Sequence, residues 1–422
     1  MYLESVRSIL RDRPLFRSNL IATSGTLANL FLAYLFHFVM TRMLLQSQYG
    51  DLSVLIGLFA VASVPAASIS AVLTRELSKL EAKRQFKKMH FVLFKYLKNV
   101  TLLSALLIIV ISLAALFVYN SRELQWAAAI ISLGIPAAYF MNMASSYFQS
   151  KENIVVLMAI GVAREFFKLA SAVLLVFMGF GLLGAAASFP AGYLVVVLVL
   201  AAFFRFRLKG TTPYTISLKK SFFILMLTSF MISAFMYLAL FFVKYYLGSV
   251  SAGIYNVAEV TSKVLFYLAA GIVLVVFPKS SKLSYAKDPA ALKQLIWKSS
   301  AFLLPVLVAF VLFSGPLISF FYPDEYAGAA PVLTLLAIGT FFFAIFTILL
   351  NIMWSQRQER FPFLLLIAGI GLHALLLNLL VPVLHLQGAA LAVVLSSFTL
   401  LTAVSIRIWY SLRPQAFRRA GA

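Results

Sequence analysis

The sequence predicts an all-α polytopic membrane protein with about twelve transmembrane helices. Of its 422 residues, 63% are hydrophobic and only 11% are charged, which leaves too little polar surface to cover a soluble globule. Long apolar runs alternate with short charged or turn-rich breaks along the chain, and landmarks of the first half return in the second. These runs leave no room for a separate soluble catalytic domain.

The predicted spans follow one another with short connections. Each has about the 20 apolar residues needed to cross about 30 Å of hydrocarbon. Several arginines precede the first run, but it lacks a small-residue cleavage pattern, so we expect a retained helix and not a signal peptide. The spans are residues 19–41, 51–74, 97–119, 125–147, 154–178, 184–204, 221–243, 253–277, 298–320, 330–353, 361–383 and 387–411.

Basic residues gather in alternate connections, which predicts the orientation. The side that carries few of them has only Arg42, Arg122 and Lys244. By the positive-inside rule, both termini lie on the cytoplasmic side of the cell (inner) membrane. The number of spans must therefore be even. The net charge of +22 then reflects topology and attraction to anionic lipid, so we expect no nucleic-acid partner. The cytoplasmic basic residues are Arg7, Arg11, Arg13, Arg17, Arg75, Lys79, Lys83, Arg84, Lys87, Lys88, Lys95, Lys98, Lys151, Arg205, Arg207, Lys209, Lys219, Lys220, Lys279, Lys282, Lys287, Lys293, Lys298, Arg357, Arg360, Arg407, Arg413, Arg418 and Arg419.

An internal repeat relates the two halves of the chain. The stretch LLQSQYG at residues 44–50 returns as LGSVSAG at residues 247–253, and Gly184-Ala185-Ala186 returns as Gly388-Ala389-Ala390. With six spans in each half, the halves share one orientation, as in a parallel repeat about an axis along the membrane normal. We therefore expect an N-terminal lobe over residues 1–210 and a C-terminal lobe over residues 211–422, with a central cleft. A duplication with a closed, inert interface is the alternative.

Charged residues lie inside two predicted spans. The fifth span contains Arg164, Glu165 and Lys168, and the eighth contains Glu259 and Lys263. A charge at a helix centre costs about 2.5 to 3.5 kcal/mol on the insertion scale, so these side chains must face protein or water. Together they include more cations than carboxylates, which predicts spare positive charge. Internal ion pairing that only fixes the packing is the alternative.

Uncharged polar residues also form stripes along several spans. Such stripes can line an aqueous interior or hydrogen bond between helices. His37 and His373 lack the spacing of metal ligands and the chain has no Cys, so we expect no metal site. The candidates for cavity lining are Asn29, Asn142, Asn256 and Asn351.

Motifs for an enzyme are missing from the sequence. It has no GxxxxGK[ST] loop for a nucleotide, no HExxH and no GxSxG. Asp324 and Glu325 lie in the short loop FYPDEYAG, where a solvated turn explains them equally well. We therefore expect a transporter that is not an enzyme and that holds no cofactor.

Four segments carry a family resemblance: LLQSQYGDLSVLIGL, AGIYNVAEVTSKV, FYPDEYAGAAPVLTLLAIG and LHLQGAALAVVLSS. They resemble the Wzx-type polysaccharide flippases of the multidrug/oligosaccharidyl-lipid/polysaccharide (MOP) exporter superfamily. The resemblance implies two lobes arranged as a V, which move a polyprenyl-(pyro)phosphate-linked oligosaccharide to the outer leaflet for cell-surface polysaccharide biosynthesis. The family's cavities are often basic, which makes Arg164, Lys168 and Lys263 candidates for substrate binding, with Arg42, Arg75 and Lys244 nearer the membrane surfaces.

The source of energy and the partners are further expectations. Without a nucleotide site, direction would come from an ion gradient, the membrane potential or removal of product, with Glu165 and Glu259 as candidates for H+ or Na+ coupling. Membrane lipids and other polysaccharide-assembly proteins are expected partners of a monomer. The alternatives are an ion-coupled multidrug exporter, whose cavity would be acidic, a membrane-embedded polymerase or glycosyltransferase, which needs a large outer loop, and a non-transporting scaffold.

Overall fold

The computed structural model describes residues 13–119, 121–204, 212–214, 220–281, 283, 289–356, 358 and 360–412. Every regular element in these ranges is a helix, which confirms the all-α class. Several of the basic residues that define the predicted orientation lie outside the described residues: Arg7, Arg11, Arg205, Arg207, Lys209, Lys219, Lys282, Lys287, Arg357, Arg413, Arg418 and Arg419.

The chain divides into two compact units by its contacts. The first contains Met1–Leu45 and Leu55–Lys219, and the second contains Gln46–Val54 and Lys220–Ala422. The first nine residues of helix α3 thus group with the second half of the chain, because they pack on helix α9 of that half. The division into lobes at residue 210 and the arrangement of the lobes stay predictions.

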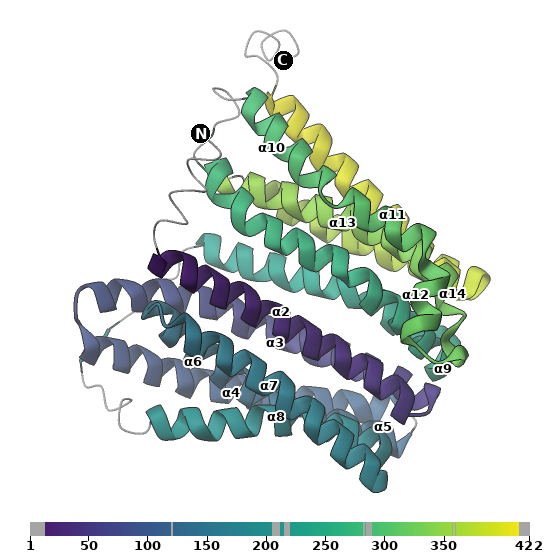
Figure 1. The fold of residues 1–422 in the computed structure, drawn as a ribbon, viewed down its shortest axis with the longest axis horizontal. Helices are drawn as coiled ribbons and strands as arrows, with labels where there is room; N and C mark the ends of the chain where they lie inside the picture. Colours follow the sequence, from purple (N-terminus) through teal and green to yellow (C-terminus); the bar gives the residue numbers. More distant parts are fainter. Residues whose placement is uncertain are drawn as a thin grey trace. The chain divides into compact units, whose positions relative to one another are not determined.

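The first unit is a bundle of long helices, drawn from purple to teal in Figure 1. Helix α7 packs between α2 and α8, and α8 also packs against α5 and α6. A short π-helical turn, η1, joins α7 to α8. The helices are α2 (Arg13–Met43), α3 (Gln46–Ala82), α4 (Phe86–Val118), α5 (Arg122–Ser132), α6 (Gly134–Ser150), α7 (Ile154–Leu175), η1 (Val176–Phe180) and α8 (Gly181–Phe204).

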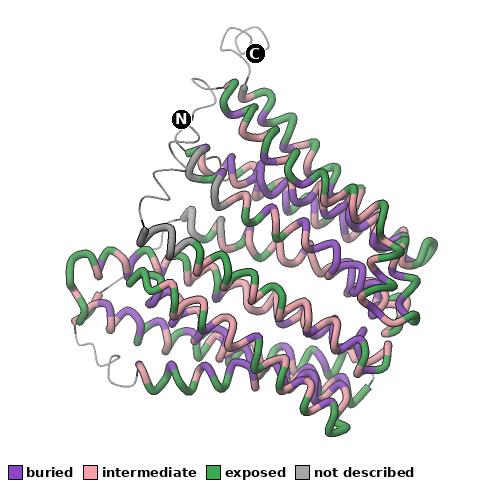
Figure 2. The backbone as a smooth tube through the Cα atoms, in the orientation of Figure 1, coloured by how far each residue is buried: buried purple, intermediate pink, exposed green. Residues whose placement is uncertain are grey.

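The second unit is organised around α13. This helix packs against both α9 and α14, and its residues make up much of the buried core, as Figure 2 shows. Phe343 of α13 stacks on Phe235 of α9 with ring centres 4.4 Å apart. The helices are α9 (Lys220–Ser281), α10 (Pro289–Ala301), α11 (Leu304–Leu312), α12 (Ser314–Phe321), the 3-10 turn η2 (Asp324–Tyr326), α13 (Ala329–Ser355) and α14 (Arg360–Leu412).

Nine helical segments of the described chain are long and apolar enough to cross a membrane. Three of them are about 50 residues long, and each contains a residue with non-helical backbone angles: Gly179, Gly248 and His385. These residues fall between the predicted spans five and six, seven and eight, and eleven and twelve. Apolar side chains also face outward, as Leu102 at 67% and Phe117 at 87% exposure show on α4. Such a surface suits hydrocarbon, so the chain is a multi-pass membrane protein.

Candidate functional site

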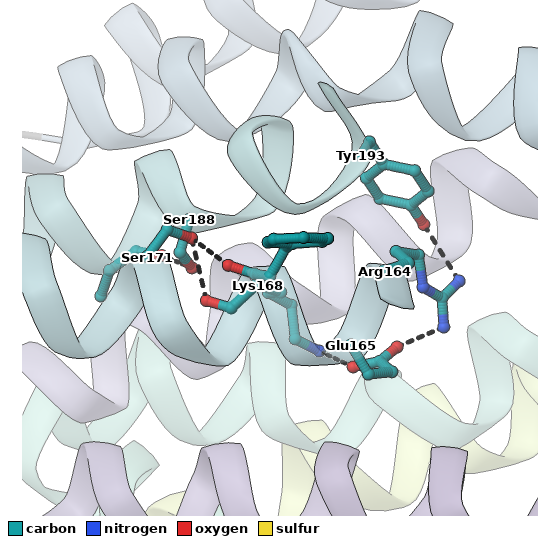
Figure 3. A network of polar contacts seen from close by, with 8 residues as sticks. Arg164, Glu165, Lys168, Ser171, Ser188 and Tyr193 are labelled. Carbon is teal, nitrogen blue, oxygen red and sulfur yellow. Dashed lines mark hydrogen bonds and ion pairs between the residues drawn. The ribbon is translucent and has the colours of Figure 1, made fainter. Parts of the chain in front are cut away.

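A cluster of three charges lies at the middle of α7. Glu165 forms ion pairs with both Arg164 and Lys168, as Figure 3 shows. The side chains are 29% exposed for Arg164, 7% for Glu165 and 12% for Lys168. Two cations share one carboxylate, so the cluster keeps one positive charge that has no acidic partner among the described residues. Both cations nevertheless have an ion-pair partner, as in the packing alternative, so substrate binding by this cluster stays a prediction.

The cluster lies at the middle of α7, in a helical segment that is long and apolar enough to cross a membrane. Arg164 and Glu165 lie ten residues from the two ends of α7, which is about 15 Å at the rise of an α-helix. A charged group at that depth is costly unless protein or water surrounds it. The location therefore fits a functional group better than an anchor at the membrane surface.

Aromatic rings from two other helices surround the cations. The Lys168 ammonium lies 4.8 Å from the ring centre of Phe36 on α2 and 5.2 Å from that of Phe189 on α8. The Arg164 guanidinium lies 5.5 Å from the Tyr193 ring centre and donates a hydrogen bond of 3.4 Å to its hydroxyl. Ring faces attract cations and replace part of their lost hydration. Ring contacts therefore stabilise both cations.

Glycine at position 192 allows α7 and α8 to approach this closely. A Cβ atom on Gly192 would lie 2.7 Å from Cβ and 2.9 Å from Cα of Lys168. These are contacts with the base of the side chain and with backbone, which cannot rotate away. A side chain at position 192 would therefore separate the helices or move Lys168.

Asn29 extends the polar surface on α2. It packs on Gly161, one turn before Arg164, where a Cβ atom would come within 2.8 Å of its amide nitrogen. That nitrogen donates to the carbonyl of Gly25 at 3.0 Å, while the buried side-chain oxygen has no partner among the described residues. Asn29 thus keeps a hydrogen-bond acceptor near the charge cluster.

The second unit contains a matched ion pair. Lys263 lies 2.6 Å from Glu259 and 3.7 Å from the ring centre of Tyr237, and both charged side chains are almost fully buried. The pair borders a cavity of about 20 Å³, whose lining also includes Tyr255, Ser262 and Thr340. That volume is about enough for one water molecule. One cation meets one carboxylate here, so the surplus positive charge belongs to α7 alone among the two clusters.

The remaining predicted cations have local partners. Arg42 lies over the Phe38 ring at 3.8 Å, Arg75 lies 3.3 Å from Glu76, and Lys244 pairs with Asp51. Lys244 is therefore neutralised in the second unit, and Arg75 is more than half exposed. The contacts bring none of these three into the cluster on α7.

The other predicted asparagines hydrogen bond within the helix packing. Asn256 donates to the Tyr49 hydroxyl at 2.9 Å, and Asn142 donates to the Ala138 carbonyl at 2.9 Å. Asn351 donates to the Thr347 carbonyl at 2.8 Å. These hydrogen bonds match the alternative in which the polar stripes serve helix packing. That the three residues line a cavity stays a prediction.

The aromatic residues around Arg164 and Lys168 are missing from the predicted site. Phe36, Phe189 and Tyr193 lie in apolar spans, where a ring that faces lipid and a ring that faces a cation have the same sequence pattern. The signal that could have identified them is Gly192, because small residues in membrane helices are enriched where two helices pack closely.

Solved structures of similar fold cover almost the whole chain. The inward-facing conformation of a multidrug resistance MATE family transporter of the MOP superfamily has a TM-score of 0.73 and 13% identity, and the match covers 96% of this chain and 99% of that one. The lipid II flippase MurJ, in an inward closed conformation, has a TM-score of 0.68 and 13% identity, over 92% of this chain and 87% of that one. A MOP superfamily transporter from Pyrococcus furiosus has a TM-score of 0.59 and 14% identity, over 94% and 96%.

The sequence comparisons identify a family. No curated protein matches the chain. Residues 15–284, more than half of the chain, match the family described as "Polysaccharide biosynthesis protein". Because this match covers more than half of the chain, the multi-pass protein belongs to the polysaccharide biosynthesis protein family.

Proposed function

We propose that the protein is a flippase that moves a polyprenyl-(pyro)phosphate-linked oligosaccharide from the cytoplasmic to the outer leaflet by alternating access. The observation that carries this proposal is the α7 cluster, in which Arg164 and Lys168 share Glu165 at the middle of a membrane-long helical segment. The family match supports a role in polysaccharide biosynthesis, and the MOP-type fold supports transport.

The chemistry of the cluster suits an anionic headgroup. Phosphate and sugar hydroxyls lose their hydration in hydrocarbon, which costs several kcal/mol for each unsatisfied group. A guanidinium can hold two phosphate oxygens in a fork, and an ammonium acts as a point charge. A surplus cation attracts such a group and repels the cationic drugs that a multidrug exporter carries. The lipid tail would stay in the bilayer.

We propose twelve crossings in two parallel halves. Six of the nine membrane-long segments cross once, and the three with a non-helical residue in the middle cross twice. An even number is consistent with both termini on the cytoplasmic side of the cell membrane. The internal repeat is supported by Gly50 and Gly253, which are equivalent in the repeat and pack against each other within the second unit.

Ion coupling, a monomeric state and contacts with other polysaccharide-assembly proteins complete the proposal. Glu165 and Glu259 are the carboxylates proposed for H+ or Na+ coupling, since both lie in membrane helices next to a cation. A proton or sodium ion bound to either carboxylate would neutralise it and weaken its ion pair with the neighbouring cation. The change in local packing would then favour one conformation of the transporter.

The test is transport of a fluorescent polyprenyl-pyrophosphate-linked sugar in liposomes that contain the full chain. We expect the label to become accessible to an impermeant quencher on the far leaflet with the wild type, and at least tenfold more slowly with Arg164→Gln/Lys168→Gln. Lys293→Gln/Lys298→Gln, which removes two exposed cations from α10, is the matched control and should transport normally. Wild-type protein that exports a cationic dye but not the lipid-linked sugar would show a multidrug exporter instead.

A further inference from the structure

A basic cavity lies at the turn between α3 and α4, away from the α7 cluster. Its volume is about 390 Å³, and its lining consists of Arg84, Gln85, Phe86, Lys87, Lys88 and Thr212. Three of the six lining residues are cations and none is acidic. Cavities of about 300 to 1,000 Å³ are the usual size for binding a small molecule or headgroup.

The acidic residue one turn before this cavity already has a partner. Glu81 pairs with Lys151 at 3.1 Å, and Lys151 also lies 5.3 Å from the ring centre of Phe86. Among the described residues, no carboxylate forms an ion pair with Arg84, Lys87 or Lys88. The cavity therefore has an uncompensated positive charge, which an anion would neutralise.

The backbone at Arg84 is an independent observation. Arg84 has a left-handed φ of 52°, its N–H donates to the Glu81 carbonyl at 2.8 Å, and the Gln85 N–H donates to the Leu80 carbonyl at 2.9 Å. These two bonds are the Schellman ending of a helix, and its left-handed position strongly favours glycine. An arginine there is less stable than glycine by about 1 kcal/mol or more. A strained residue with an exposed charge in a cavity indicates a role for its side chain.

The predicted side of the turn favours a lipid over a soluble anion. Helix α3 ends at Ala82 and α4 begins at Phe86, within the basic segment that joins the predicted spans 51–74 and 97–119 on the cytoplasmic side, where anionic lipids are abundant. Phe86 is 43% exposed, and Phe94, two turns further along α4, is 50% exposed. A lipid would place its phosphate in the basic cavity and its acyl chains against the apolar side chains of α4.

We propose that this cavity binds the phosphate of an anionic phospholipid headgroup from the surrounding bilayer. Basic pockets at the ends of membrane helices provide both the electrostatic attraction and the depth for such a headgroup. Arg84 and the two lysines contact the phosphate, and Phe86 packs against the first part of the acyl chains. This lipid site is separate from the proposed transport site and does not depend on it.

The test uses the purified full chain in a detergent with a neutral headgroup, titrated with short-chain phosphatidylglycerol and followed by native mass spectrometry. We expect saturable binding of phosphatidylglycerol and at least tenfold weaker binding of phosphatidylcholine with the same chains. Each cation near an anionic headgroup contributes about a fivefold gain in affinity, so Lys87→Gln/Lys88→Gln should weaken binding about 25-fold. Arg84→Gly should weaken it about fivefold while its melting temperature stays equal or rises, because glycine relieves the backbone.

Two control variants separate this site from general effects. Glu152→Gly changes the equivalent left-handed residue at the end of α6, whose φ is 54°, and Lys293→Gln/Lys298→Gln removes the same net charge elsewhere. Both should bind phosphatidylglycerol as the wild type does. Three results would overturn the assignment to an anionic lipid. The first is that the α10 variant loses as much affinity for phosphatidylglycerol as Lys87→Gln/Lys88→Gln, and the second is that phosphatidylcholine binds as tightly as phosphatidylglycerol. The third is that inorganic phosphate, at the concentration of the lipid, displaces it completely.

Discussion

Gly50 of α3 and Gly253 of α9 contact each other where no side chain fits. A Cβ atom on Gly50 would lie 1.8 Å from the carbonyl oxygen of Ser249, and one on Gly253 would lie 2.7 Å from that of Gln46. The two contacts mirror each other, because Gln46 and Ser249 have the same offset in the repeat as the two glycines. A reciprocal contact of this kind is what the proposed repeat would produce.

Replacing Gly50 by Val should therefore destabilise the protein strongly. The obstructing atoms are backbone, so the helices must separate, and overpacking of this kind costs about 1 to 3 kcal/mol or more. A lower melting temperature of the purified protein in detergent is the measurement. Gly271→Ala is the control, since no described neighbour lies within 4 Å of its Cβ position, and it should be neutral or stabilising.

Glu165→Gln should destabilise the first unit by leaving two partly buried cations without a carboxylate. Removing one partner of a buried pair costs about 3 to 5 kcal/mol. The double variant Glu165→Gln/Lys168→Gln keeps the net charge of the wild-type cluster, so it should recover much of that loss. Thermal unfolding of the two variants and of Lys168→Gln alone completes the cycle. Strict additivity would show that the ion pairs contribute no coupling.

Two substitutions of Tyr193 distinguish its hydrogen bond to Arg164 from the contact of its ring with the guanidinium. Tyr193→Phe keeps the ring and removes the hydroxyl that accepts the hydrogen bond of 3.4 Å, so a loss of about 1 kcal/mol or less is expected. Tyr193→Leu also removes the ring face and should lose about 0.5 to 2 kcal/mol more. Thermal stability and the rate of lipid-linked sugar transport should fall in the same order. Equal values for the two variants would mean that the ring does not hold the guanidinium.

Glu259→Gln should change how transport depends on pH or sodium. The carboxylate faces Lys263 beside a cavity that has room for about one water molecule, so a bound ion would compete with the ammonium. Transport rates in liposomes across a range of pH and of sodium concentration test this. Ser262→Ala, which lines the same cavity without a charge, should keep the wild-type dependence. The same dependence in the wild type and in Glu259→Gln would remove this residue from the coupling proposal.

The spans and the buried charges were predictable because their signals are local. About 20 apolar residues define a membrane helix, and a charge such as Arg164 within one cannot face lipid. The partners of these charges were less predictable. Phe189 and Tyr193 lie in a later span, and Phe36 lies in the first, so only the packing of three helices brings them to one place. Asn256 shows the opposite case, since its polar stripe hydrogen bonds to Tyr49 in the helix packing.

The surroundings of Lys168 also have a consequence for biogenesis. Phe36 is synthesised well before α7, whereas Phe189 and Tyr193 follow it, so the nascent α7 leaves the ribosome before its cation has all its aromatic neighbours. A segment with three charges is retained poorly by the translocon when it is alone. Stable integration of α7 should therefore wait until α8 has emerged, and truncation before residue 181 should leave α7 exposed to membrane quality-control proteases.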